Sequence, residues 1–331
     1  MDTAVAEPES ESPLPRRKSG FVTALLVLAM LGTAGWAAPA LLGFDTANRY
    51  TIALAATLQY AVPVGSVLTV LGLVLRRWLT TLIVGLLTVV LAILVLPRAI
   101  PDSPTPVQGS PLRVLSVNLF FGRAEPEHVV DLVRDGRIDV LSLQELTPEA
   151  VAELDRAGLA ELLPHRVLHS GPQADGTGIA SRYPLRELPL VPPTSLAQPS
   201  ALIDLPGRRD VEFVAVHPIY PVGADTAGDW LRELTALPRP PGERETPRIL
   251  AGDFNATLDH SPLRALLGSG YADAAEVTGA GLTPTWGAGW MPRATIDHLL
   301  TSEGLVTQEY SVLDVPGTDH RAISGHIVIP D

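Results

Sequence analysis

The chain has 331 residues and a formal net charge of −12, and its mean hydropathy is positive (+0.24) although 18% of its residues are charged. A uniform soluble domain rarely combines these properties, so we expect membrane segments joined to a soluble part. The chain contains no cysteine, which excludes disulfide frameworks, thiolate metal sites, iron–sulfur clusters and cysteine nucleophiles.

The charges are spread unevenly along the chain. The first 111 residues contain 6 acidic and 7 basic residues, which leaves 30 of the 36 acidic and 17 of the 24 basic residues for residues 112–331. Lys18 is the sole lysine of the chain. Because affinity for nucleic acid depends on neutralisation of phosphates, a region this acidic is not expected to have a nucleic-acid partner.

The N-terminal third has the composition of a membrane anchor. Residues 1–20 are rich in Pro, Glu and Ser and are predicted to form a disordered cytoplasmic tail. Three uncharged runs follow, and each reaches the 20 or so residues that a helix needs to cross a bilayer. They predict transmembrane helices at about 21–43, 51–75 and 79–97. A cleaved signal peptide explains the first run less well, because two more runs follow it.

Basic residues predict the orientation of this anchor. Arg16, Arg17 and Lys18 precede the first run, and Arg76 and Arg77 lie between the second and the third. The positive-inside rule therefore places the N-terminus and the second loop in the cytoplasm. Everything after residue 97 is then extracytoplasmic, on a multi-pass protein of the cell membrane. Residues 98–111 are rich in Pro and Ser and are predicted to be a semi-rigid tether.

Residues 112–331 have the pattern of an α/β domain. Apolar, β-branched runs typical of buried strands alternate with helical periodicity in the first half, and strands dominate the second half. The expected strands are LRVLSVNLF, IDVLSLQEL, GTGIASRYPL, VEFVAVHP, RILAGDFN, TIDHLLTS, TQEYSVLDV and AISGHIVI, with helices near 126–137, 149–163 and 229–237. This mixture predicts a layered α/β domain with partly antiparallel sheets.

Polar side chains recur where these apolar strands stop. They are Asn118, Glu145, His217, Asp253, Asn255, Asp297, Asp319 and His320. A buried strand ending in a carboxylate or an amide is costly unless the group has a partner or a function, so the repetition predicts a site at a sheet edge. Hard oxygen donors without cysteine favour Mg²⁺ or Mn²⁺.

The order of these motifs resembles the endonuclease/exonuclease/phosphatase superfamily. The matching segments are SVNL, SLQEL, GIASRYPL, VAVHP, AGDFNA, PTW followed by TIDHLL, and TDH. That group includes pancreatic-type DNases, abasic-site endonucleases, neutral sphingomyelinases and inositol polyphosphate phosphatases. The resemblance covers residues 112–331. It implies a four-layer α/β sandwich and a metal-dependent hydrolase of a phosphoric ester or anhydride.

The resemblance also implies roles at the metal and the substrate. Glu145 is similar to the main metal carboxylate of the family, with Asn118 beside it, and Asp319 resembles a second acid near the metal. Arg182 matches the family segment SRYP, in which such a residue either packs or contacts phosphate. Arg293 is a further candidate for phosphate binding because it lies near Asp297 in sequence.

The catalytic residues follow from the same resemblance. Asp253 and Asn255 look like the pair that positions the attacking water and the phosphoryl group. His320 is similar to the catalytic histidine, and Asp297 to the carboxylate that orients it. His217 matches a histidine that stabilises the transition state or protonates the leaving group in some members. A histidine held by a carboxylate has a fixed tautomer and can exchange a proton near neutral pH.

For some other polar residues the sequence suggests a structural role, and for Trp286 it leaves the role undecided. His298 follows Asp297 on the same strand and is expected to point to the opposite face, and Asp259 and His260 resemble a helix start. Trp286 precedes the TIDH strand in a Gly-rich loop. The sequence leaves open whether it forms a lipid-facing or substrate-stacking rim or closes the hydrophobic core.

The whole architecture resembles the bacterial VanJ-type proteins linked to teicoplanin resistance. This resemblance implies a membrane-anchored Mg²⁺-dependent phosphatase or phosphodiesterase that contributes to glycopeptide resistance. Its partners would be the lipid bilayer and a lipid-linked phosphate such as undecaprenyl-pyrophosphate. Two alternatives stay open from the sequence: a surface nuclease, and a non-catalytic binding or immunity module on the same fold.

Overall fold

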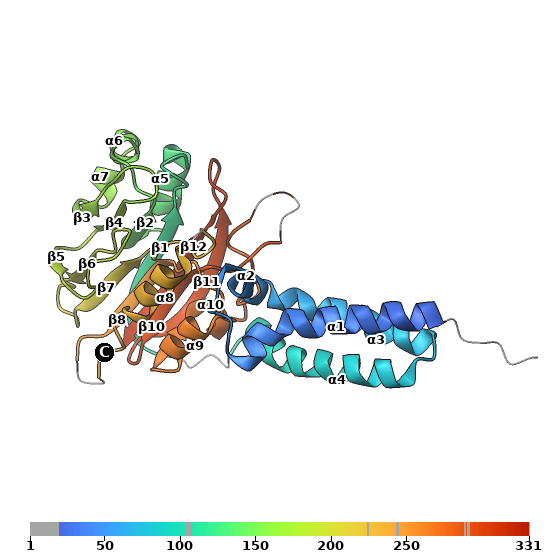
Figure 1. Ribbon diagram of the computed structural model, residues 1–331. Coiled ribbons are helices and arrows are strands. Elements are labelled where there is room, and N and C mark those ends of the chain that lie inside the picture. Colours follow the sequence, from blue (N-terminus) through green and yellow to red (C-terminus); the bar gives the residue numbers. More distant parts are fainter. Residues whose placement is uncertain are drawn as a thin grey trace, which may run out of the picture.

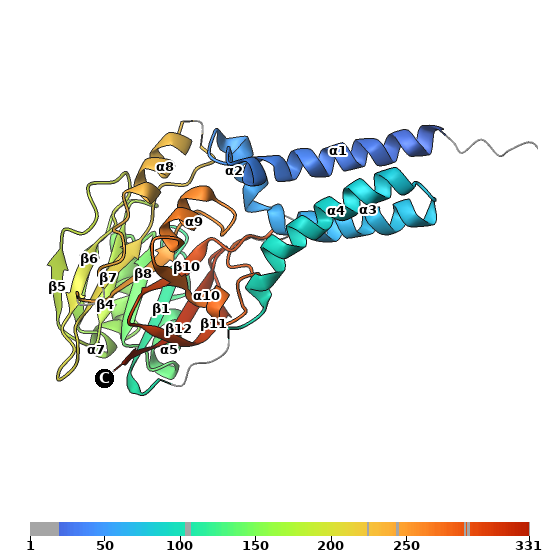
Figure 2. The same cartoon turned by 90° about the horizontal axis from the view of Figure 1, so that it is seen from below.

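The computed structural model describes residues 20–102, 107–223, 225–242, 245–287, 289 and 292–330, so the predicted N-terminal tail lies almost entirely outside the described residues. A bundle of apolar helices projects from an α/β domain, and the two parts meet along one side of that domain (Figures 1 and 2).

The bundle consists of α1 (Gly20–Leu42), α3 (Ala61–Val74) and α4 (Trp78–Val95). Glycines let α3 and α4 approach closely. A Cβ at Gly65 would lie 2.2 Å from Thr88 Oγ1, and one at Gly72 would lie 2.4 Å from Thr81 Oγ1. Small residues at helix contacts of this kind are typical of membrane helices, where packing replaces the hydrophobic drive for association.

The second predicted span is not one straight helix, which corrects the continuous helix expected at about 51–75. Its residues form α2 (Arg49–Ala56), a 3-10 turn η1 (Leu58–Tyr60) and α3, with a bend of 52° between α2 and the remainder. The described residues contain two helices long and apolar enough to cross a membrane, Gly20–Leu42 and Trp78–Ala99, or three if the bent pair is one span.

The bend has a local cause and a tertiary one. Asn48 caps α2 in a capping box with Thr51, so a helix begins there. Ile52 is then buried in the apolar cluster that contains Trp230 and Leu263 of the α/β domain. An uncharged run gives no signal that distinguishes a helix buried in lipid from one buried against protein, so the sequence pattern alone predicted a continuous span.

The α/β domain contains two six-stranded sheets. The first has the order β11-β12-β1-β2-β4-β3, with β1 (Gly109–Asn118), β2 (Val140–Gln144), β3 (His165–His169), β4 (Thr177–Ser181), β11 (Val306–Asp314) and β12 (Arg321–Pro330). The second has the order β5-β6-β7-β8-β10-β9, with β5 (Leu185–Leu188), β6 (Ser200–Ile203), β7 (Val211–Val216), β8 (Arg248–Asp253), β9 (Tyr271–Asp273) and β10 (Asp297–Ser302).

Helices cover the outer faces of both sheets, which gives four layers. One apolar cluster lies between the sheets, a second lies between the first sheet and its helices, and a third lies between the second sheet and its helices. The helices on the first sheet are α5 (Pro126–Asp135), α6 (Pro148–Arg156) and α7 (Leu159–Leu162); those on the second are α8 (Ala227–Thr235) and α9 (Ser261–Leu267). The predicted layered α/β domain with partly antiparallel sheets is confirmed.

Strand directions bring the polar strand ends together. β1 runs parallel to β2, and β7 runs parallel to β8, so the carboxyl ends of each pair lie at one edge. β12 is antiparallel to β1 and β10 is antiparallel to β8, so these two strands begin at that same edge. Asp297 at the start of β10 is directly opposite Asp253 at the end of β8.

The helical bundle and the domain are joined by buried polar contacts. Arg98, in the 3-10 turn η2 (Leu96–Ala99), forms two hydrogen bonds of 3.0 and 2.7 Å with Asp259, and both side chains are buried. The buried Asp45 accepts hydrogen bonds from the backbone and the hydroxyl of Ser261. Arg98 is therefore fixed on the domain, although the sequence placed it at the start of a tether.

The chain between η2 and β1 differs in one further respect from the predicted tether. Residues 109–111 already pair with β12, so β1 begins three residues before the expected start of the domain at residue 112. The short helix α10 (Ala274–Val277) also contacts this region, where the backbone of Asp102 donates a hydrogen bond to the Val277 carbonyl. The ends of residues 98–111 thus contact the domain directly.

Candidate active site

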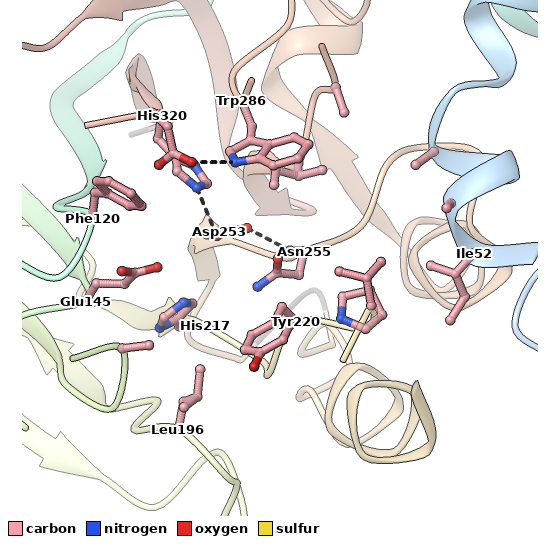
Figure 3. A pocket seen from close by; sticks show the side chains of 18 of the residues that line it. Ile52, Phe120, Glu145, Leu196, His217, Tyr220, Asp253, Asn255, Trp286 and His320 are labelled. Carbon is pink, nitrogen blue, oxygen red and sulfur yellow. Dashed lines mark hydrogen bonds and ion pairs between the residues drawn. The ribbon is translucent and has the colours of Figure 1, made fainter. Parts of the chain in front are cut away.

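The strand ends surround one cavity of about 320 Å³ (Figure 3). Six predicted site residues line it, namely Glu145, His217, Asp253, Asn255, Asp319 and His320. Asn118 and Asp297 lie behind this wall and hydrogen-bond to residues that line it. The eight residues predicted from the strand ends therefore form one constellation. A cavity of this volume is in the range of small-molecule sites.

Glu145 leaves the end of β2 in a left-handed backbone conformation, with φ of 55°. Few residues other than glycine adopt this conformation, and it recurs at functional sites where the surroundings enforce it. Its carboxylate accepts hydrogen bonds from the Phe121 backbone at 2.7 Å and from Asn118 Nδ2 at 3.3 Å. Burial raises the pKa of Glu145, against the opposing effect of these hydrogen bonds.

Asn118 connects the two sheets at the site. Its Nδ2 donates to Glu145 and also to Asp253 Oδ2 at 3.1 Å, while its Oδ1 accepts from the Phe120 backbone at 2.9 Å. The amide thus holds two carboxylates from different sheets near each other. The predicted role of Asn118 as a metal ligand stays a prediction.

Asp253 and Asn255 form the turn after β8. Asp253 Oδ1 accepts the Asn255 backbone N–H at 2.8 Å, and Asn255, with φ of 49°, donates its Nδ2 to the Pro218 carbonyl at 3.0 Å. The preceding Gly252 is required by its neighbours, since a Cβ there would lie 2.0 Å from the Val216 carbonyl oxygen. The GDFN segment is thus shaped both by close strand packing and by the turn.

His320 and Asp297 form a buried pair. His320 Nδ1 lies 3.0 Å from Asp297 Oδ2, and His320 Nε2 faces Asp253 Oδ2 at 3.7 Å. Burial alone lowers the pKa of His320, but the nearby carboxylates of Asp297 and Asp253 outweigh it and raise the pKa to about 10. The imidazole is therefore protonated at neutral pH, with Asp297 fixing its orientation and Nε2 directed at the reacting region.

The carboxyl group of Asp253 has a strongly shifted pKa. Burial is the main cause that raises its pKa to about 7, and the charge of His320 opposes it. His217 shows the reverse behaviour, because burial, helped by the charge of His320, lowers its pKa to about 3. His217 is thus neutral at physiological pH, and its buried Nδ1 has no hydrogen-bond partner among the described residues. A neutral imidazole facing the cavity can bind an anionic substrate oxygen by donating one hydrogen bond.

Asp319 and Trp286 both line the cavity, and Trp286 lies at its upper side in Figure 3. Trp286 Nε1 donates to Asp319 Oδ2 at 3.1 Å, whereas the buried Asp319 Oδ1 has no partner among the described residues. Trp286 therefore orients an acid of the site as well as lining the cavity. This contact answers the question that the sequence left open about Trp286 in favour of a role at the site.

The donor set fits a hard divalent cation. Carboxylates of Glu145, Asp253 and Asp319 line the same cavity, Asp319 keeps a buried oxygen unpaired, and burial raises the pKa of the first two. No lysine or arginine is among the described residues that line the cavity. A cation held by Glu145 and Asp319, with Asn118 nearby, would neutralise these charges. It would also polarise a phosphoryl oxygen when bound.

A second grouping of possible ligands is less suited to a metal. Asp253, Asp297 and His320 offer ligand atoms that lie within 4.8 Å of one another. However, these groups already interact with one another, since His320 Nδ1 lies 3.0 Å from Asp297 Oδ2 and its Nε2 faces Asp253 Oδ2 at 3.7 Å. We therefore interpret this trio as acid–base machinery beside the metal carboxylates.

The structure corrects both predicted substrate-binding arginines. Arg182 follows β4 at the opposite end of the sheet from Glu145, because β4 runs antiparallel to β2 and its start pairs with Gln144. Its guanidinium lies 3.4 Å from Asp139. Arg293 does not line the cavity, and its backbone carbonyl accepts hydrogen bonds from Gln59 and Tyr60. The motif match misplaced Arg182, and nearness in sequence to Asp297 misplaced Arg293.

Some cavity residues had no signal in the sequence. Ile52, Ala53 and Ala56 of α2 line the cavity, as does Tyr220 after β7. The α2 residues belong to an uncharged run that has the composition of a membrane span, so nothing in the pattern assigned them to the domain. Tyr220 lies three residues after His217, and an aromatic so close to a candidate site residue was the one available indication.

The comparisons with known proteins agree with this geometry. Residues 115–320 match the model of the endonuclease/exonuclease/phosphatase family. The chain belongs to this family. No curated protein matches the chain.

Solved structures show the same fold. An endonuclease/exonuclease/phosphatase from Beutenbergia cavernae is 18% identical, with 66% of this chain and 72% of that chain covered and a TM-score of 0.52. A humanised TDP2 from D. rerio is 16% identical, with 66% of this chain and 98% of that chain covered and a TM-score of 0.51.

Membership of the family defines the class of reaction. Its members are metal-dependent hydrolases of phosphoric esters, which confirms the prediction of an enzyme of this class. The residues of the site can perform the necessary steps. Asp253 and Asn255 can hold a water, the protonated His320 can stabilise charge on a phosphoryl oxygen or protonate a leaving group, and His217 adds a neutral donor.

Proposed function

We propose that the protein is a membrane-anchored, Mg²⁺-dependent phosphatase or phosphodiesterase that acts on a membrane-borne phosphate. The observation that carries the proposal is the position of the cavity. It contains the polar constellation at one end and residues of α2, the helix that leads directly into the apolar bundle, at the other. A substrate that stays in the bilayer would present its phosphate at this junction, and tethering raises its effective concentration at the site.

The charge of the cavity favours a substrate with few phosphates. The described residues that line it include three carboxylates and no lysine or arginine. Polyanions such as nucleic acids are bound mainly through cationic side chains, so the cavity gives no support to the alternative of a surface nuclease. A single phosphate or diphosphate neutralised by Mg²⁺ fits this lining better, and oxygen donors are the ligands that Mg²⁺ prefers.

The proposed physiological substrate is a cell-wall lipid carrier such as undecaprenyl-pyrophosphate, and the proposed role is a contribution to teicoplanin resistance. The support is the overall order of basic cluster, apolar helices and hydrolase domain, which resembles VanJ-type proteins. The proposed orientation is an N-terminus in the cytoplasm and the hydrolase domain outside the cell membrane. Arg76 and Arg77, between the second and third apolar runs, support this orientation.

Hydrolysis assays with the full-length protein in detergent micelles test the function, with free phosphate measured for the diphosphate and the inositol phosphate, and phosphocholine or oligonucleotides measured for sphingomyelin and DNA. Undecaprenyl diphosphate, sphingomyelin, an inositol phosphate and DNA are compared with and without Mg²⁺, and His320→Ala serves as the inactive control. We expect Mg²⁺-dependent release from the lipid diphosphate that His320→Ala abolishes. Preferential cleavage of DNA would support the nuclease alternative. A teicoplanin resistance level that is equal with the native chain and with His320→Ala would contradict the resistance role, and a cytoplasmic signal from a reporter fused after residue 111 would contradict the orientation.

A further inference from the structure

We infer that α2 is part of the substrate site and that, with Phe121, Tyr220 and Val222, it forms an apolar wall for the hydrocarbon chain next to the phosphate. This inference rests on the proposed function and adds the residues that recognise the lipid. The occupant we propose is the chain of a lipid phosphate that enters from the bilayer side.

The first observation is the shape of the cavity. In Figure 3, Glu145 and His217 lie at one end and Ile52 of α2 lies at the other, with Tyr220 and Trp286 between them. Ala53 and Ala56 of α2 also line the cavity. A substrate whose phosphorus is near Glu145 therefore has space to extend along apolar side chains toward α2.

The second observation is where exposed apolar side chains occur. Among the described residues, the large apolar side chains that are exposed lie within residues 21–100, with three exceptions. These exceptions are Phe121, Tyr220 and Val222, which are 39%, 50% and 56% exposed, and all three line the cavity. Soluble domains seldom leave such side chains together without a partner, and here they continue the apolar surface of the bundle to the site.

The third observation is that α2 is held firmly against the domain. His260 Nδ1 accepts the Thr257 backbone N–H at 2.8 Å, so its Nε2 carries the proton and donates to the Ile52 carbonyl at 3.0 Å. Gln59 and Tyr60, which follow α2, donate to the Arg293 carbonyl at 3.3 and 2.9 Å. The membrane segment is thus a fixed wall of the site.

The fourth observation places α2 at the level of a membrane surface. Tyr50 of α2 and Tyr60 of η1 lie on the domain side, where Tyr60 donates to the Arg293 carbonyl, whereas Trp78 begins α4, and it is the opposite end of α4 that leads into η2 on the domain. Figure 1 shows α2 at the domain end of the bundle. Tyrosine and tryptophan concentrate at the two interfaces of a bilayer. The segment Trp78–Ala99 has 22 residues, or roughly 33 Å of helix, which matches a bilayer core. A lipid phosphate in the adjacent leaflet would therefore have its head group near the cavity.

Substrates that share a head group and differ in chain length test the inference. Phosphate release from isopentenyl diphosphate and from farnesyl diphosphate is measured with full-length protein in detergent, and the selectivity is the ratio of the two kcat/KM values. Ala53→Trp fills the apolar end of the cavity from an exposed position, and Val222→Asp places a charge on the facing wall. Leu54→Trp is the matched control, because Leu54 is exposed on the same helix and does not line the cavity.

We expect the native chain to prefer the longer chain and both cavity variants to reduce the selectivity at least about tenfold, which corresponds to about 1.4 kcal/mol. Leu54→Trp should retain the native selectivity. If the native protein hydrolyses both substrates and the cavity variants keep its selectivity, the inference is wrong while the proposed function stands. If the native protein hydrolyses no diphosphate or lipid phosphate at all, both fail.

Discussion

Substitution of Asp297 by Asn separates the charge of the buried pair from its shape. Asp297 accepts from His320 Nδ1 at 3.0 Å, and an asparagine oxygen can accept the same hydrogen bond. The backbone N–H of Asp297, which donates to Thr285 Oγ1 at 3.1 Å, is unaffected by the change. Asp297→Asn therefore removes a negative charge from the site and leaves the packing almost unaltered.

The magnitude follows from the pKa of His320. The carboxylates around His320 raise it from 6.5 to about 10 against the effect of burial. At about 1.36 kcal/mol for each pH unit, this is a preference for the protonated form on the order of 5 kcal/mol. Asp297 is the largest of the favourable causes and Asp253 the next. Loss of about half of the preference is on the order of 2.5 kcal/mol, or roughly two pH units, so we expect kcat/KM to fall about 50- to 100-fold at alkaline pH, where His320 of the variant has lost its proton, and much less at neutral pH.

The assay is the pH dependence of kcat/KM, together with a thermal unfolding curve. In the native chain the imidazolium of His320 persists toward pH 10, and in Asp297→Asn it loses its proton at lower pH. The alkaline limb of the profile should therefore move to lower pH in the variant. A pH profile of kcat/KM that is unchanged in the variant would refute the assignment of Asp297 as the residue that orients and charges His320. A loss of activity that unfolding of the variant at the assay temperature fully explains would refute it as well.

Three further substitutions test other parts of the structure. His298 Nδ1 lies 2.7 Å from the buried Asp273, so His298→Ala leaves that carboxylate without its partner. The free energy of unfolding, measured by thermal unfolding, should fall by about 3–5 kcal/mol. Burial lowers the pKa of His298, but Asp273 outweighs it and holds the pKa above 6.5. Native stability should thus fall as pH rises through this higher pKa, and His298→Ala should lack that fall. Arg98→Ala should similarly destabilise the contact between the helical bundle and the domain, because it leaves the buried Asp259 without its partner. Increased sensitivity to proteolysis is the measurement. Arg182→Ala should leave kcat/KM within about twofold, and a larger loss would contradict its position away from the site.

The strand pattern was sufficient to predict the polar constellation. Asn118, Glu145 and Asp253 follow apolar, β-branched runs, and a strand of that kind has few stable positions other than the interior of a sheet. Successive side chains of a strand point to opposite faces, so His298 was predicted to point away from Asp297 and to have a structural role. In the structure His298 pairs with Asp273, while Asp297 faces His320. The period of two in a strand decides these orientations without knowledge of the tertiary fold.

Long-range packing could not be predicted in the same way. The run that contains Ile52 is uncharged whether it is surrounded by lipid or by Trp230 and its neighbours, so hydropathy alone indicated one straight span. Arg182 was misplaced for a related reason. A motif match gives the strand to which a residue belongs, whereas the antiparallel pairing of β4 with β2 determines at which end of the sheet the residue lies.

The central claim is that polar side chains from separate strand ends hold a divalent cation and direct water at phosphorus. The most direct test is the Mg²⁺ dependence of phosphate release from undecaprenyl diphosphate by the native chain, by Glu145→Ala, and by Glu149→Ala, an exposed acid on α6 that serves as the control. We predict activity that EDTA abolishes, a loss of at least about 100-fold in Glu145→Ala, and no change in Glu149→Ala. Activity that persists in EDTA, or that Glu145→Ala retains, would contradict the claim.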